Sequence, residues 1–275
     1  MFYIPYEKIV EYISYHHTKS NPINLDFHLH EGFEIYFLIS GDVDYFVENK
    51  FYPLRTGDLI ITNTQEIHKP AFNSSKTYER IVLEFNPDLL SYFSSEKFNL
   101  LKCFLDRPIG EQNKVTLNPE QRKDLLEFFY KIEALQGQKN ASRDILKLNY
   151  LIELLVYINI VFMNIPVNVE HKNIHEKLIP IIDYIDQHLS EDLSLQTLEE
   201  IFYINKYYLS KLFKNNIGSN LHEYIIFKRI SMAKTLLTKG VNVTDTCSKC
   251  GFNDYSNFLK MFKRTVGFSP GQYKK

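Results

Sequence analysis

The sequence predicts an α+β protein of two domains, an antiparallel β-barrel followed by an all-α domain. The 275 residues exceed the roughly 100–200 residues of a typical domain. Between residues 24 and 85, short runs of β-branched and aromatic residues alternate with turn residues, whereas the chain after Pro87 has the apolar period of helices. Hydrophobic residues make up 44% of the chain and charged residues 24%, as in globular proteins with a sizeable core.

Turn residues divide the region 24–85 into short strands. Tight turns are predicted at 41–42, 48–50 and 56–58, where Gly, Asp and Asn interrupt the apolar runs. Runs joined by such short turns pair antiparallel, so this region is expected to form the barrel.

Two helices are predicted after the barrel. Asn118 followed by Pro119 is a typical helix start, and the helices are expected over 120–135 and 142–163. A broad apolar stripe on the second helix is either core or an oligomer interface; it comprises Ile145, Leu148, Leu151, Ile152, Leu155, Val156 and Val161. We expect a homodimer through Ile145, Leu148, Leu151, Ile152 and Leu155.

The domain boundary is expected where the apolar period is lost, between Pro166 and Asn173. The predicted organisation is a first domain over residues 1–166, a linker over 167–174 and a second domain over 175–275.

An internal repeat marks the second domain. The run Leu209-Ser-Lys-Leu-Phe-Lys lies just before Gly218, and the run Phe258-Leu-Lys-Met-Phe-Lys lies just before Gly267, at an offset of 49 residues. Each run ends a short helix–turn–helix pattern, and residues 221–238 can form one helix between the two. A doubled unit of this kind predicts a pair of helix-turn-helix modules that bind double-stranded DNA.

The charge distribution agrees with a polyanionic partner for the C-terminal part. The net charge of the whole chain is −1, but residues 206–275 contain thirteen Lys and Arg against three Asp and Glu, a net charge of +10.

The N-terminal sequence and the cysteine content predict a soluble cytoplasmic protein with no membrane partner. Three cysteines are too few and too odd in number for a disulfide framework. No basic stretch followed by an apolar run opens the chain, and the apolar run 151–163 is shorter than the ~20 residues of a membrane span.

The end of the chain, from Gly251-Phe-Asn-Asp-Tyr-Ser to Phe268-Ser-Pro-Gly-Gln-Tyr, closely resembles the signature of the AraC/XylS family of bacterial transcription regulators. The similarity begins near His175; further matching positions are Leu209, Phe213, Lys214, Gly218, Arg229, Ala233, Leu236 and Leu237. The resemblance implies two helix-turn-helix modules on one rigid helix, so that both second helices reach successive major grooves.

The resemblance also assigns DNA-contacting positions to the two recognition helices. They are Lys206, Tyr207, Ser210, Lys211 and Lys214 in the first, and Tyr255, Ser256, Asn257, Lys260, Lys263 and Arg264 in the second. Lys211 and Lys260 occupy positions that read bases in the family, and Tyr207, Ser210, Ser256 and Asn257 can add specificity because lysine lacks the planar fork of arginine. Lys214, Lys263 and Arg264 are expected to bind phosphates.

The chain departs from the family pattern at three places. Glu199 and Tyr203 replace the usual Ala and Gly of the first module, which predicts a looser approach of its two helices. Cys247 replaces a usual Ala. With Cys250 it could form a redox or zinc pair, but the register places both cysteines in the core as small apolar residues.

A second motif lies in the barrel. The spacing of four residues matches the first motif of the cupins, which are small double-stranded β-helix barrels. These residues are His28-x-His30, then Glu34 after three residues, then Gly41 after six more. The second cupin motif is degraded: His68 is present, but Asn63, Gln65 and Phe72 replace its usual residues. The resemblance therefore implies a cupin-type sensor and dimerisation domain over 1–166.

Three interpretations of the barrel are left open. It can sense a small molecule without metal, bind a divalent metal through His28, His30, Glu34 and His68, or be a metal-dependent enzyme with an appended helical domain. For a small effector, the polar wall is predicted to be His30, Glu34, Tyr36, His68 and Arg80, which suits a sugar and, through Arg80, also a small carboxylate.

The function expected from both resemblances is that of a ligand-responsive, sequence-specific transcription regulator. We expect an activator of carbohydrate-uptake or metabolism genes that responds to a sugar and contacts RNA polymerase. No enzymatic activity and no obligatory cofactor are expected. The alternatives are the cupin metalloenzyme and a constitutive DNA-binding protein whose barrel only dimerises.

Overall fold

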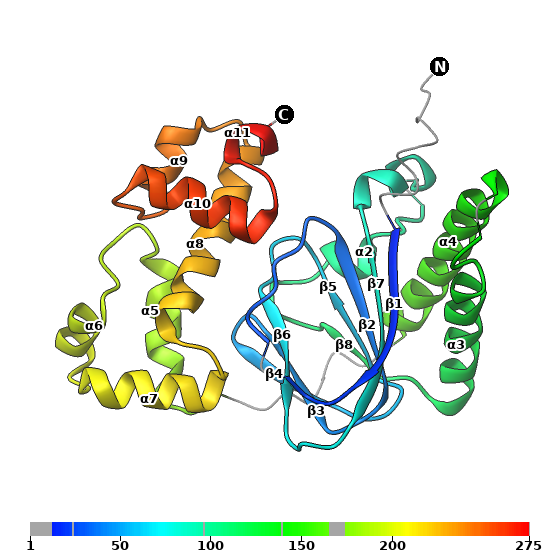
Figure 1. Ribbon diagram of the computed structural model, residues 1–275, viewed down its shortest axis with the longest axis horizontal. Helices are drawn as coiled ribbons and strands as arrows, with labels where there is room; N and C mark the ends of the chain where they lie inside the picture. Colours follow the sequence, from blue (N-terminus) through cyan, green and yellow to red (C-terminus); the bar gives the residue numbers. More distant parts are fainter. Residues whose placement is uncertain (1–12, 24, 96, 139, 165–173, 275) are drawn as a thin grey trace.

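A computed structural model describes residues 13–23, 25–95, 97–138, 140–164 and 174–274. Its architecture is α+β, as predicted: a β-barrel with two helices on one side and an all-α domain on the other (Figure 1). The predicted linker, 167–174, lies outside the described residues except for Ile174.

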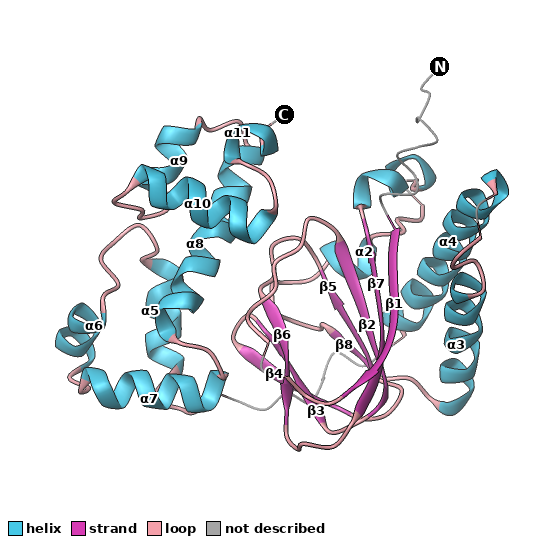
Figure 2. Cartoon of the chain, in the orientation of Figure 1, coloured by secondary structure: helices cyan, strands magenta, loops and turns pink. Residues whose placement is uncertain are grey.

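Two antiparallel sheets form the barrel (Figure 2). The first has the strand order β1-β7-β2-β5-β8 and the second β4-β3-β6. The strands are β1 Ile13–Ser20, β2 Phe33–Ser40, β3 Val43–Val47, β4 Lys50–Leu54, β5 Leu59–Thr62, β6 His68–Phe72, β7 Tyr78–Phe85 and β8 Lys114–Val115. The turns at 41–42, 48–50 and 56–58 fall between strands as predicted, but β1 and β8 lie outside the predicted β region.

The alternation of side chains along β2 separates two cores. Glu34, Tyr36 and Leu38 face the second sheet inside the barrel, in a cluster of buried aromatic and aliphatic side chains. Phe33, Ile35 and Phe37 belong to a second core on the other face of the sheet. That core is completed by the helices that follow the barrel.

Those helices are the 3₁₀-helix η1 Pro87–Phe93, α2 Lys102–Leu105, α3 Pro119–Glu133 and α4 Ala141–Met163. Asn118 caps α3 in a capping box with Gln121, as its sequence predicts. Leu151 and Leu155 on α4 are fully buried against the first sheet and α3. The assignment of these two residues to a dimer interface was therefore wrong, because their own chain covers them.

The exposed apolar surface of α4 lies on another face of the helix. Ile145 is 61% exposed, Ile160 48% and Met163 51%, and Leu148 and Ile152 are partly buried. By length and composition alone, residues 142–163 would suffice to cross a membrane, but this helix is also a core helix packed against the barrel.

The C-terminal domain consists of α5 Ile179–Gln187, α6 Leu195–Phe202, α7 Lys206–Ile217, α8 Leu221–Thr238, α9 Val243–Lys249, α10 Tyr255–Val266 and α11 Pro270–Tyr273. Ser194 and Asn205 cap α6 and α7, and α8 covers the predicted range 221–238. Its 18 residues give a helix about 27 Å long that joins the two helix pairs.

The outer face of the second sheet packs against this domain. Phe46, Phe51 and Ile67 share one core with residues of α5 to α10, including Tyr224 of α8. Lysines at the boundary are buried with partners: Lys69 donates to Ser219 Oγ at 2.6 Å, and burial lowers its pKa to about 8. The first domain and the C-terminal domain thus share a continuous apolar interface.

Candidate functional site

Two helix pairs, α6–α7 and α9–α10, form the modules that the repeat predicts. The second helix of each pair begins with a side-chain cap: Asn205 accepts hydrogen bonds from the amides of Tyr207 and Tyr208, and Asp254 accepts one from Asn257. Each ends at a glycine in the left-handed region, Gly218 with φ 75° and Gly267 with φ 90°. The offset of 49 residues therefore reflects two equivalent helices.

The predicted DNA-contacting residues lie on the solvent-accessible side of these helices. Lys206 and Ser210 are partly buried; the others are exposed, namely Tyr207, Lys211, Lys214, Tyr255, Ser256, Asn257, Lys260, Lys263 and Arg264. The apolar positions between them, Leu209, Phe213, Phe258 and Phe262, are fully buried. Each helix thus presents a basic and polar face that a DNA groove can accept.

The departures from the family pattern have a local role in the first module. Glu199 Oε1 accepts a hydrogen bond from the backbone amide of Lys206 at 3.0 Å, so it satisfies one of the free amides at the start of α7. Tyr203 ends α6 with φ 53°, a left-handed conformation, and its side chain is 95% exposed.

Substituting Tyr203 by glycine is expected to raise the free energy of unfolding by about 1 kcal/mol. A non-glycine residue pays a steric cost of about 1–2 kcal/mol in the left-handed region, and the exposed ring loses little packing. Urea unfolding monitored by circular dichroism measures the change. Tyr203→Ala, which keeps the Cβ, is the control and should leave the stability within about 0.5 kcal/mol.

The cysteines behave as core residues. Cys247 and Cys250 are free and buried, and burial raises the pKa of both thiols, that of Cys250 to about 12. A protonated buried thiol is a poor nucleophile and a poor metal ligand, in agreement with the apolar interpretation.

The barrel brings together His30, Glu34 and His68. His30 lies in the loop before β2, Glu34 on β2 and His68 at the start of β6, and their ligand atoms lie within 4.8 Å of one another. His28 was predicted to join them, but it is not a member of this group. Its ring instead stacks on His30 with centroids 5.6 Å apart.

The electrostatics of the cluster favour an ionised Glu34. Burial opposes ionisation, but His68 and His30 hold the pKa of Glu34 well below its usual range. Tyr45 donates a hydrogen bond of 2.7 Å to Glu34 Oε1. Burial and the neighbouring His68 lower the pKa of His28 to about 4, so this imidazole is neutral.

The other predicted wall residues, Tyr36 and Arg80, lie on the interior face of the first sheet. Among the described residues, no hydrogen-bond partner is found for the buried atoms Tyr36 Oη and Arg80 Nη1, and the Arg80 guanidinium lies 4.8 Å from the centre of the Tyr78 ring. Buried polar atoms without partners are rare and often mark a site for a ligand or a water. Both atoms are available to a polar effector.

A cavity lies between the barrel and the C-terminal domain. It has a volume of about 460 Å³ and is lined by His28 and His30 from the first domain and by His222, Phe227 and Arg264 from the second, among others. A predicted phosphate-binding residue, Arg264, therefore faces the segment that carries the barrel histidines.

The comparison with known families decides the identity of the chain. A family model described as an AraC-like ligand binding domain matches residues 12–155, just over half of the chain. The protein belongs to the AraC family. A second model, a helix-turn-helix domain, matches residues 198–275 of this AraC-family chain.

Relatives of this AraC-family protein are named as transcriptional regulators, not enzymes. The HTH-type transcriptional regulator SAR0107 of Staphylococcus aureus is 25% identical over 252 residues, which is 91% of this chain and 32% of the relative. YijO of Escherichia coli is 35% identical over 97 residues, 34% of each chain. The chain spans 32–40% of the length of the first curated relatives. The solved structure of ToxT from Vibrio cholerae is 13% identical, covering 95% of this chain and 97% of its own, with a TM-score of 0.38.

Several residues of the two sites carry no sequence signal. Tyr45, which orients Glu34, lies in an ordinary apolar run, and its role depends on the pairing of β3 with β6. Lys228 and Lys234 of α8 read as surface charges in a basic domain, but both contact the barrel. A helical wheel shows only that these two lysines share a helix with apolar residues; it does not show that the barrel covers them.

Proposed function

We propose that the protein is a ligand-responsive, sequence-specific DNA-binding transcription regulator. The observation that carries the proposal is the pair of equivalent capped helices, α7 and α10, with exposed lysines at matching positions and one rigid helix between them. Lysines on such helices can bind phosphates and bases in successive major grooves. The cytoplasm is the compartment in which a bacterial regulator meets its DNA.

A sugar is the proposed effector, and an activator of carbohydrate-uptake or metabolism genes that contacts RNA polymerase is the proposed regulatory role. Aromatic rings around Tyr36 offer stacking to a polyhydroxylated molecule, and Tyr36 Oη and Arg80 Nη1, which have no partner among the residues that the structure describes, offer directed hydrogen bonds. The effector would bias the packing of the two domains and so their affinity for DNA.

A DNase footprint of the purified protein on DNA flanking its own gene tests this function. We expect two protected half-sites about one helical turn apart, as two linked modules require. A panel of sugars added to the same reaction identifies the effector by a changed protection. No protection at low salt would contradict the DNA-binding function, and protection unaffected by every sugar would contradict the effector class.

We propose that a homodimer forms through the exposed face of α4 and not through the buried Leu151 and Leu155. Ile145→Glu with Ile160→Glu is expected to convert a dimer to a monomer, because a charge on this face must be desolvated in the interface. Light scattering measures the mass. The control is Glu153→Lys, a charge change on the same helix; a wild-type monomer, or a dimer that survives the double substitution, would contradict the interface.

A further inference from the structure

Three ligand atoms of the barrel are spaced to bind one metal ion. Glu34 Oε2 lies 3.2 Å from His30 Nε2 and 3.7 Å from His68 Nε2. Atoms bound to a transition metal at about 2.0–2.1 Å are themselves roughly 3 Å apart, so small adjustments bring all three onto a single ion. Two imidazoles and one carboxylate suit Zn²⁺, Fe²⁺, Co²⁺ or Ni²⁺.

The hydrogen bonds of His68 leave a lone pair directed at the carboxylate. Nδ1 of His68 lies 2.8 Å from the carbonyl oxygen of Glu66, which can only accept, so Nδ1 carries the hydrogen. Nε2 is buried and has no hydrogen-bond partner within the described part of the chain, in a residue that is 1% exposed. Two acceptors that face each other in a buried site need a cation between them, which either a proton or a metal ion supplies.

Neighbouring residues hold the ligands in this orientation. The Tyr45 hydroxyl fixes Glu34 Oε1 and turns Oε2 toward the imidazoles. Arg107 binds the Glu66 side chain in an ion pair of 2.6 Å that is fully buried, which anchors the loop whose carbonyl orients His68. Such outer residues commonly orient metal ligands. The interdomain cavity beside His30 gives access for an ion and room for further ligands.

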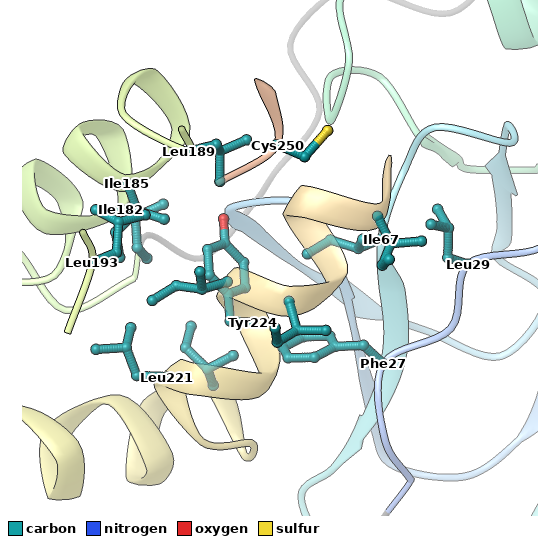
Figure 3. Packing of buried hydrophobic residues seen from close by; sticks show 14 of the residues in the cluster. Phe27, Leu29, Ile67, Ile182, Ile185, Leu189, Leu193, Leu221, Tyr224 and Cys250 are labelled. Atoms are coloured by element: carbon teal, nitrogen blue, oxygen red, sulfur yellow. The ribbon is translucent and has the colours of Figure 1, made fainter. Parts of the chain in front are cut away.

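The same segment also contacts the DNA-binding domain. His28 and His30 alternate with Phe27 and Leu29, which are buried in the core shared with that domain. Figure 3 shows Phe27, Leu29 and Ile67 beside α8, with the residues of α5 on the opposite side of that helix. The Phe27 ring lies 5.8 Å from that of Tyr224, centroid to centroid.

A hydrogen bond completes this connection. Lys234 of α8 donates to the carbonyl oxygens of His30 at 2.7 Å and of Thr64 at 2.9 Å. A shift of His30 on binding an ion therefore moves an acceptor of α8, the helix that joins the two DNA-binding modules. Two sites that share such an element can be coupled.

We propose that His30, Glu34 and His68 bind a divalent transition-metal ion, and that its binding changes the affinity of the protein for DNA through residues 27–30 and α8. The first part stands on the cluster alone, and the second part rests on the proposed regulatory function.

Calorimetric titration of the full chain, without an affinity tag and after dialysis against a chelator, tests the metal site with Zn²⁺ and Co²⁺. We expect one ion per chain. Its affinity should fall at least about tenfold in Glu34→Gln and His68→Gln, and about tenfold in Tyr45→Phe, which removes only an orienting bond. His16→Gln, an exposed histidine of β1, is the matched control and should bind as wild type. No saturable binding, or equal affinity in all variants, would overturn the site and leave a proton as the shared cation.

Thermal unfolding of each variant shows whether it folds. If His68→Gln does not fold, Tyr45→Phe still tests the metal site. The coupling is tested by the affinity for the footprinted DNA with and without Zn²⁺, where we expect a change of at least about fivefold in wild type and none in Glu34→Gln. Zinc binding with unchanged DNA affinity would refute the coupling. Absence of specific DNA binding in both states would refute the proposed function and leave the titration result standing.

Discussion

Replacing Lys228 by methionine is expected to lower the free energy of unfolding by about 3 kcal/mol at neutral pH. Lys228 lies on α8 with its side chain 14% exposed, and its Nζ contacts Glu48 of the barrel and lies 3.2 Å from Asp186 of α5. Methionine fills a similar volume but leaves two carboxylates at the domain boundary without their cation. Removing one partner of a buried pair costs more than the pair itself contributes.

The pH dependence of this loss follows from Glu48. Burial raises the pKa of Glu48 above its ordinary value, although Lys228 opposes the rise, and without Lys228 the pKa must rise further. A carboxyl with a raised pKa in the folded state contributes stability below its unfolded pKa and loses it as the pH rises through the folded pKa. The difference between wild type and Lys228→Met should therefore widen as the pH rises from about 5 to 7.

Urea titrations at both pH values measure the effect, and Lys239→Met is the control. Lys239 is exposed just after α8, so its substitution should change the stability by less than about 0.5 kcal/mol. Equal midpoints for the two variants would contradict the interdomain ion pair. A loss that does not grow with pH would contradict the role of Glu48.

The features that the sequence predicts best are local. Asn118, Ser194 and Asn205 cap helices because an Asn or Ser side chain binds the amides of the next turn, and this depends on a few neighbouring residues only. The range 221–238 is likewise bounded by local signals. The spacing of the two cupin motifs also indicated His30, Glu34 and His68, whose ligand atoms lie within 4.8 Å of one another.

The features that could not be predicted from the sequence depend on which surfaces pack against each other. An apolar stripe on α4 does not tell whether the same chain or a second copy covers it, so Leu151 and Leu155 were assigned to the wrong partner. The two-residue strand β8 exists only because β5 is its neighbour. His28 has the expected parity and its ring lies beside those of His30 and His68, with centroids 5.6 and 6.1 Å away, but it is not a member of the ligand group.

Substituting Lys211 or Lys260 by alanine is expected to weaken specific DNA binding by about 1–3 kcal/mol each. Both are exposed on the recognition helices, at the same position of the 49-residue repeat, one turn inside each helix. From there a lysine reaches the base edges of the groove that its helix occupies. Each substitution should weaken the discrimination between bases mainly within one half-site. A competition assay with single-base variants of the footprinted DNA measures this discrimination position by position.

The variant Lys263→Ala distinguishes contacts to bases from contacts to phosphates. Lys263 lies in the last turn of α10, where a phosphate contact is expected, so its loss should weaken binding to all sequences alike and reduce the slope of log affinity against log salt by about 0.9. Lys239→Ala, exposed and outside both recognition helices, should leave specific affinity and slope unchanged. If Lys260→Ala instead behaves like Lys263→Ala and keeps the sequence preference, Lys260 binds a phosphate. Specificity in the second module would then come from the polar residues of the first turn of α10, Tyr255, Ser256 and Asn257, whose side chains are exposed beside it.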